Sequence, residues 1–248
     1  MSDRLVTVEP RGNVAVVRID RPPANAMNPA LLEEVIGVRE ELEADAVVLT
    51  GRDGFFSAGL DLNLVPTLDP AGQAEMIMAI NRMVAAWYGF DRPVVGAVNG
   101  HAIAGGIVLA MCADYRVGST QGKLGLTEAR VGVPYPANAL AVVTAELSPP
   151  AARYLVLRAH LVDPPEALAL GLVDELAEPA EVLERALAMA AELGDMPSDA
   201  YATVKRQLRG PALAAMRQVV ESGTDPLAQG WLSAETGSAA TAAMDRKG

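Results

Sequence analysis

The sequence of 248 residues is poor in cysteine, histidine and aromatic side chains. Its one cysteine, Cys112, cannot form an internal disulfide, which is typical of proteins in a reducing compartment, so we expect a cytoplasmic protein. The two histidines, His101 and His160, lie far apart and have no cysteine beside them, so we expect no metal site. The sequence also has no glycine motif for a dinucleotide and no P-loop for nucleotide phosphates.

Positive charge is scarce as well. Lysine and arginine number 20 against 31 aspartates and glutamates, which gives a formal net charge of −11 at pH 7. A nucleic acid or an anionic membrane would require a basic face, so we expect neither as a partner. An acidic protein can still bind a small anionic molecule through a few local donors, so small-molecule ligands remain open.

Only one long uncharged stretch occurs, at residues 94–113. Its length would suffice to cross a bilayer. However, it contains Asn99, His101 and four glycines, so we interpret it as a short buried strand over 94–98, a glycine-rich turn and a buried helix. Charged residues throughout residues 1–20 also argue against a signal peptide.

Strand and helix patterns alternate through roughly the first 180 residues. We expect strands over 14–19, 46–51 and 94–98, and a helix over 71–89. Another helix is expected to begin with Asn28 as its N-cap and Pro29 as its first residue. This alternation predicts an α/β core with sites where strands run into loops.

The last part of the chain has a different pattern. From about residue 181 the sequence is rich in Ala, Leu, Glu and Met at helical spacing, with no strand candidates. The sequence therefore predicts a core over residues 1–189 and a helical region over 190–248. Residues 194–211 are interpreted as a break between two of its helices.

Three stretches contain residues suited to a functional site. In "GFFSAGLDLNLV" (54–65), small residues let a ligand approach the backbone, and a turn can leave the Leu60 N–H free to donate. In "GHAIAGGIVLAMCADYRV" (100–117), Gly105 and Gly106 open a helix, where N–H groups without intrahelical partners can hold an oxyanion. In "GLTEARVGVP" (125–134), Glu128 follows an apolar strand, and apolar walls around a carboxylate would raise its pKa towards that of a useful base.

Each stretch also has a purely structural explanation: a tight turn, glycines used for close packing, and a solvated glutamate at a strand end. Their order and intervals, together with "RIDRPPANAMNP", "LVDPPEALALGLVDEL" and "SDAYATVKRQL", resemble the crotonase superfamily, also called the enoyl-CoA hydratase/isomerase family. The resemblance covers about residues 5–210.

This resemblance implies a spiral of β-β-α units followed by C-terminal helices that mediate trimers, often paired into hexamers. It implies an acyl-CoA thioester as substrate, with coenzyme A as part of that substrate and no separate cofactor. The Leu60 and Gly105 N–H groups would hold the thioester oxygen as it becomes an enolate. The coenzyme A channel would be lined by Pro23, Ala24, Ala26, Ala58, Asp61 and Leu62.

The sequence departs from the family pattern in its acids. Hydratases of the family usually carry two glutamates, one on the helix three residues past the oxyanion glycine and one in the later loop. Here the helix position is Val108, whereas the loop position is Glu128. Family members that move a 3-enoyl double bond to the 2-position commonly keep only the loop glutamate, so we expect an isomerase with Glu128 as the sole acid and base.

Other functions stay open on the same scaffold. The enzymatic alternatives are a hydratase, a decarboxylase or a thioester hydrolase, because chemistry varies on a shared fold. Val108 also leaves open a coenzyme A-binding protein without turnover. Tyr135 is expected either to line the acyl pocket or to close it, and His160 to lie in an exposed connection.

Overall fold

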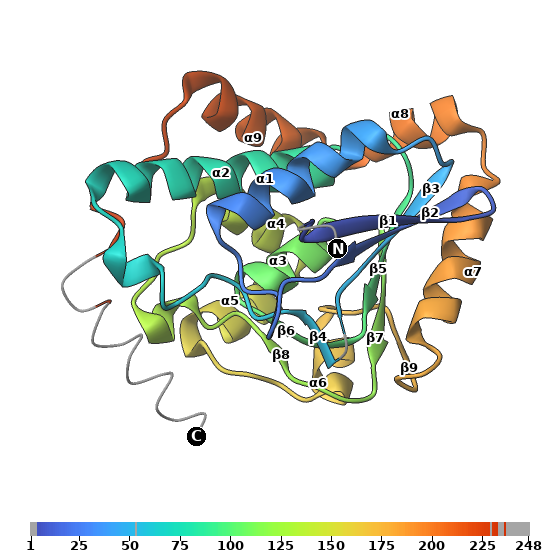
Figure 1. Ribbon diagram of the computed structural model, residues 1–248, viewed down its shortest axis with the longest axis horizontal. Coiled ribbons are helices and arrows are strands. Elements are labelled where there is room, and N and C mark those ends of the chain that lie inside the picture. The colour runs from blue at the N-terminus through green and yellow to red at the C-terminus, as the bar shows by residue number, and fades with distance from the viewer. Residues whose placement is uncertain (1–3, 53, 229, 233–235, 237–248) are drawn as a thin grey trace.

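Two sheets form the framework of the protein (Figure 1). The computed structural model describes residues 4–52, 54–228, 230–232 and 236. The larger sheet has the strand order β1 (Val6–Arg11), β2 (Val14–Ile19), β3 (Ala46–Thr50), β5 (Val94–Val98), β7 (Tyr115–Ser119), β9 (Glu175–Ala177). The smaller sheet consists of β4 (Gly54–Ser57), β6 (Gly100–Ile103) and β8 (Leu124–Gly125). All neighbours are parallel except β1 and β2.

The chain alternates between these sheets. Each of β3, β5 and β7 in the large sheet is followed at once by β4, β6 or β8 in the small one, and then by helical structure. The helical elements that follow are α2 (Pro70–Tyr88), α3 (Gly105–Met111) and the 3-10 turn η3 (Glu128–Val131). This repeat is the expected spiral of β-β-α units, and it confirms the α/β fold class.

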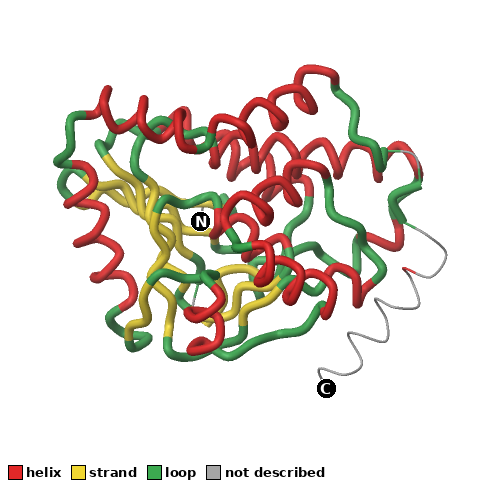
Figure 2. Tube along the Cα trace, turned by 180° about the vertical axis from the view of Figure 1, so that it is seen from behind, coloured by secondary structure: helices red, strands yellow, loops and turns green. Residues whose placement is uncertain are grey.

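Helices cover both faces of the large sheet (Figure 2). Strands β3 and β5 are buried along their whole length, and alternate side chains point to opposite faces. Val48 and Val95 pack with Ala186 and Ala190 of helix α7 (Val182–Gly194). Side chains of the opposite face join the main core with α1 (Pro29–Gly37), α2 and α3.

The remaining helices are α4 (Ala137–Glu146), α5 (Pro149–Arg158), α6 (Pro164–Leu170), α8 (Ser198–Leu208) and α9 (Gly210–Ser222), with short 3-10 turns η1 (Val38–Glu41) and η2 (Val65–Thr67). Helix α1 begins as predicted, with Pro29 first and Asn28 Oδ1 accepting from the Leu31 N–H at 2.9 Å. The uncharged stretch at 94–113 contains the expected strand β5 and helix α3, but strand β6 lies where a glycine-rich turn was expected. Among the described residues, no helix combines the length and apolarity needed to cross a membrane.

One prediction about the C-terminal region is wrong. Residues 194–211 hold helix α8 rather than a simple break, and the chain is interrupted only on either side of that helix. The expected boundary between residues 189 and 190 falls inside α7, which packs on the large sheet. Residues 237–248 of the predicted helical region lie outside the described residues.

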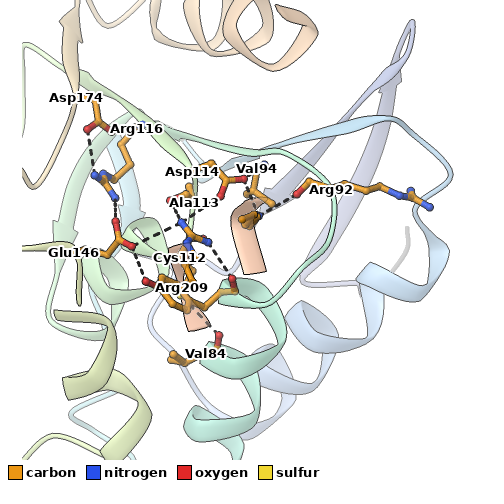
Figure 3. Close-up of polar contacts among 12 residues, drawn as sticks. Val84, Arg92, Val94, Cys112, Ala113, Asp114, Arg116, Glu146, Asp174 and Arg209 are labelled. Carbon is orange, nitrogen blue, oxygen red and sulfur yellow. Dashed lines mark hydrogen bonds and ion pairs between the residues drawn. The ribbon is translucent and has the colours of Figure 1, made fainter. Parts of the chain in front are cut away.

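Helices α8 and α9 are joined to the core by buried ion pairs around Asp114 (Figure 3). The Asp114 carboxylate accepts from the Val94 N–H at 2.8 Å and from Lys205 Nζ at 2.7 Å, and it lies 3.2 Å from Arg209. Arg209 also donates to the carbonyl oxygens of Tyr88, Cys112 and Ala113 at 2.9, 3.2 and 2.9 Å. Asp114 thus pairs with two buried cations where the C-terminal helices meet the end of α3, and Arg209 has a second carboxylate, Glu146, at 3.8 Å.

Replacing that carboxylate is expected to destabilise the fold strongly. Asp114→Ala leaves Lys205 and Arg209 buried beside an empty position, which should lower the free energy of unfolding in urea by about 3–5 kcal/mol. Asp91→Ala is the matched control. Asp91 pairs at 3.0 Å with Arg206, which lies in α8 next to Lys205, but both side chains of this pair are exposed. We expect that control to change stability by less than about 1 kcal/mol. Equal effects of the two substitutions would contradict this role of Asp114.

Candidate active site

A cavity of about 700 Å³ lies between α2, α3, the turn after β4 and the segment that follows β8. Most of the side chains that line it are apolar. They include Ile80 and Met83 from α2, Val108 from α3 and Ala139 from α4. Such a cavity is shaped for a ligand that buries a hydrocarbon part.

Two turns approach each other closely at the wall of this cavity. Gly59 has φ +79°, and a Cβ there would lie 2.7 Å from the Ile103 carbonyl oxygen and 3.1 Å from the Gly105 nitrogen. A Cβ on Gly106 would lie 2.3 Å from the Ser57 carbonyl oxygen. Only glycine fits at these two positions, and the close approach brings Leu60 and Gly105 to the same wall of the cavity.

The N–H groups of Leu60 and Gly105 are both available to a ligand. Neither donates a hydrogen bond within the described part of the chain. Gly105 is the first residue of α3, so its N–H has no acceptor one turn earlier in that helix. The preceding Ala104 has φ +52°, an unfavourable conformation for alanine that is held by its N–H donating to the Gly125 carbonyl oxygen at 2.8 Å.

A buried polar network holds the turn after β4, which contains Gly59 and Leu60, in place. Ser57 Oγ donates to the Asn25 carbonyl oxygen at 2.7 Å and accepts from the Gly59 N–H at 3.1 Å. The Asn25 side chain in turn donates to the carbonyl oxygens of Phe55 and Phe56, each at 3.1 Å. Asn25 and Ser57 are fully buried, so these bonds hold the Leu60 turn against the N-terminal loop.

Glu128 is the first residue of η3 and belongs to the same cavity. Its side chain lines the cavity although the residue is only 6% exposed. Burial raises the pKa of the Glu128 carboxyl to about 7, while a hydrogen bond from Tyr135 opposes that rise. The Tyr135 hydroxyl donates to Glu128 Oε2 at 2.6 Å, and burial together with this carboxylate raises the pKa of Tyr135 above its usual range.

The structure brings together some of the expected site residues and leaves others in the neighbouring loops. Leu60, Gly105 and Glu128 all line the cavity, as do Ala58 and Leu62. Within the described chain, Pro23, Ala24, Ala26 and Asp61 lie outside that lining. Ala24 is nevertheless adjacent, because its carbonyl oxygen accepts from the Ala58 N–H at 2.9 Å, and the Asp61 carboxylate pairs with Arg21 at 2.9 Å.

Sequence reasoning missed three features of the site. Tyr135 was expected to line or close the acyl pocket and does line the cavity, but its hydrogen bond to Glu128 was not predicted. His160 lines the cavity instead of lying in an exposed connection, so that expectation is wrong. The buried contact between Asn25 and Ser57 joins segments 32 residues apart, and no local pattern indicates it.

This arrangement suits the removal of a proton next to a carbonyl group. Two unpaired backbone donors can stabilise the oxyanion that forms, and a carboxylate with a pKa near neutrality can accept the proton. Val108, at the helix position where a second glutamate was sought, lines the cavity. Its side chain can neither donate nor accept a proton.

Known proteins resemble this chain in sequence and in structure. The family model described as "Enoyl-CoA hydratase/isomerase" matches residues 9–227. "Probable enoyl-CoA hydratase echA17" of Mycobacterium avium (strain 104) is 36% identical over 197 residues, covering 77% of this chain and 76% of that protein. "Enoyl-CoA delta isomerase 1, mitochondrial" of Rattus norvegicus is 31% identical over 217 residues, covering 84% and 75%.

The crystal structure of human mitochondrial delta3-delta2-enoyl-CoA isomerase superimposes with a TM-score of 0.86 at 27% identity, covering 98% of each chain. The fold is therefore the crotonase fold. Because the family model spans most of the chain and relatives above 30% identity cover more than two thirds of it, this protein belongs to the enoyl-CoA hydratase/isomerase family.

Proposed function

We propose that the protein is an enoyl-CoA isomerase, which converts a 3-enoyl-CoA into the conjugated 2-enoyl-CoA with Glu128 as its only acid and base. The supporting observation is that Glu128 is the one carboxylate that lines the cavity in the described chain. Hydration would need a second proton-transferring group, and the position for it is occupied by Val108. A reaction that returns the proton it removes needs a single carboxylate.

The reaction divides into two proton transfers. The Glu128 carboxylate removes a proton from C2, and the electron pair of that bond moves into the thioester, giving a dienolate whose oxygen the Leu60 and Gly105 N–H groups stabilise. The neutral Glu128 then delivers the proton to C4. The electrons shift back to leave the double bond between C2 and C3 and restore the thioester carbonyl, so atoms and charge balance.

The remaining features of the proposal concern the substrate and the assembly. The apolar lining from α2, α3 and α4 would hold a hydrocarbon acyl chain. Coenzyme A would run along Ala58 and Leu62 and the adjacent loop residues Pro23, Ala24, Ala26 and Asp61, with no other cofactor. We further propose a cytoplasmic homotrimer or homohexamer, which the mass of the purified protein in solution would test.

Hydration is the second candidate, since the Mycobacterium avium relative carries the name of a hydratase. Hydration of a 2-enoyl thioester requires one group to activate water and another to supply a proton. Val108 provides neither, and the Tyr135 hydroxyl is already bound to Glu128 at 2.6 Å. These contacts favour isomerisation.

An absorbance assay separates the two candidates and tests Glu128. With a 3-enoyl-CoA as substrate, the purified protein should increase the absorbance of the conjugated thioester. A hydratase given a 2-enoyl-CoA would decrease it.

Glu128→Gln should lower kcat by at least about 10³-fold, because an amide cannot accept the proton. Its affinity for acyl-CoA should change little, which calorimetry would measure. An active Glu128→Gln variant would mean that another group is the base.

The backbone donors can be tested through Gly59. Gly59→Ala places a Cβ against the Ile103 carbonyl oxygen and pushes the Leu60 turn away from Gly105, so we expect kcat to fall by about 10²-fold or more. Gly12→Ala is the matched control, because Gly12 also has a positive φ, +65°, but a Cβ there meets nothing within 4 Å. Thermal unfolding of both variants would separate backbone strain from the loss of donors. Equal losses of kcat in both would count against the proposed oxyanion hole.

The pH dependence should reflect the buried carboxylate. Glu128 accepts a proton only when ionised, and its pKa of about 7 means that the ionised form is lost as the pH falls through neutrality. We therefore expect kcat/KM to fall about tenfold for each pH unit below 6 and to level off above 8. A profile that stays flat between pH 5.5 and 8 would indicate a base with an ordinary carboxyl pKa of about 4.

A further inference from the structure

Tyr135 is held in place by contacts on both sides of its backbone. It stands between Pro134 and Pro136, whose rings restrict the local dihedral angles. The indole N–H of Trp231 donates to the Pro134 carbonyl oxygen at 2.8 Å. On the other side, the Ala137 N–H donates to Asp225 Oδ2 at 2.8 Å. The hydroxyl is thus presented to Glu128 from a fixed segment.

The hydrogen bond itself is short. At 2.6 Å, the Tyr135 hydroxyl and Glu128 Oε2 have the separation typical of a neutral O–H donating to a charged carboxylate. The tyrosine keeps its proton at neutral pH, because burial and the carboxylate raise its pKa above the usual range. It therefore acts as a permanent donor to Oε2 and does not occupy the other oxygen, Oε1.

Among the described residues, no charged side chain forms an ion pair or a hydrogen bond with the Glu128 carboxylate. The titratable side chains that line the cavity in the described chain are Glu128, Tyr135, Arg130 and His160. Arg130 donates its Nε–H to the Ala159 carbonyl oxygen at 2.8 Å. The neighbouring helices α2, α3 and α4 contribute only apolar side chains, among them Met83, Val108 and Ala139.

We propose that Tyr135 is the positioning residue of the proton transfer: its hydroxyl fixes Oε2 of Glu128, so that Oε1 alone removes the proton from C2 and returns it to C4. This inference rests on the proposed isomerase function. It assigns to the segment between η3 and α4 the task of orienting the base. Without the hydroxyl, the carboxylate would lose the Tyr135 hydrogen bond, become harder to ionise and be free to rotate about its terminal bond.

The test compares Tyr135→Phe with Tyr154→Phe. The control removes a hydroxyl that donates to Glu166 at 2.9 Å on the exposed surface, so it deletes the same kind of contact outside the cavity. The first measurement is the pKa of the Glu128 carboxyl, followed by ¹³C NMR in the protein without substrate, with Glu128→Gln identifying the signal. We expect Tyr135→Phe to raise this pKa by about one unit and Tyr154→Phe to leave it unchanged.

The second measurement is the pH profile with a 3-enoyl-CoA. In Tyr135→Phe the acidic limb should move up by about one pH unit, which lowers kcat about fivefold at pH 7. A further loss of about tenfold should remain on the high-pH plateau, where Glu128 is ionised but poorly oriented, while KM changes less than about twofold. Tyr154→Phe should match the parent in both respects.

The two measurements distinguish this inference from the function on which it rests. An unchanged carboxyl pKa and an unchanged profile in Tyr135→Phe would overturn the positioning role even if the parent is an active isomerase. A parent without isomerase activity would overturn the proposed reaction and with it the proton shuttle. In that case the NMR comparison would still show whether Tyr135 controls the Glu128 carboxyl.

Discussion

The close approach of two backbone turns determines the geometry of the cavity. Gly59 and Gly106 allow the turn after β4 to lie against the start of α3 at distances that no side chain would permit. The buried contacts between Asn25 and Ser57 hold one turn, and the Ala104 bond to β8 holds the other. Leu60 and Gly105 thereby share a wall of the cavity, although 45 residues separate them in the sequence.

Burial of Glu128 is the second constraint, and it acts against stability. Because its pKa is about 7, higher than that of an exposed glutamate, the folded protein binds a proton more readily than the unfolded chain between pH 4.5 and 7. Stability contributed by this group is therefore lost as the pH rises through 7, where the site would be most reactive. The Tyr135 hydrogen bond offsets part of this cost.

Sequence patterns predicted the helices and strands whose ends are determined by neighbouring residues. Asn28 and Pro29 mark the start of α1, and the glycines within residues 94–113 separate a strand from a helix. The resemblance to the crotonase superfamily also implied that Leu60, Gly105 and Glu128 lie at one cavity. The edge strand β1 was missed because it is largely exposed and its apolar alternation is limited to Val6 and Val8. Helix α8 was missed because the flanking Pro197 and Gly210 suggested a longer break. The partner of Glu128 depends on how η3 turns back towards α4, and spacing alone does not reveal such a path.

The two donors at Leu60 and Gly105 belong to the main chain, and this has a consequence for how such a protein changes over time. A substitution at either position, other than to proline, keeps the amide N–H, so the two donors depend on the path of the backbone. In the proposed mechanism, side chains around these donors, such as that of Val108, could be exchanged singly while both donors stay in place. New reactions can then arise on this scaffold by small steps, without rebuilding the pocket that makes them feasible.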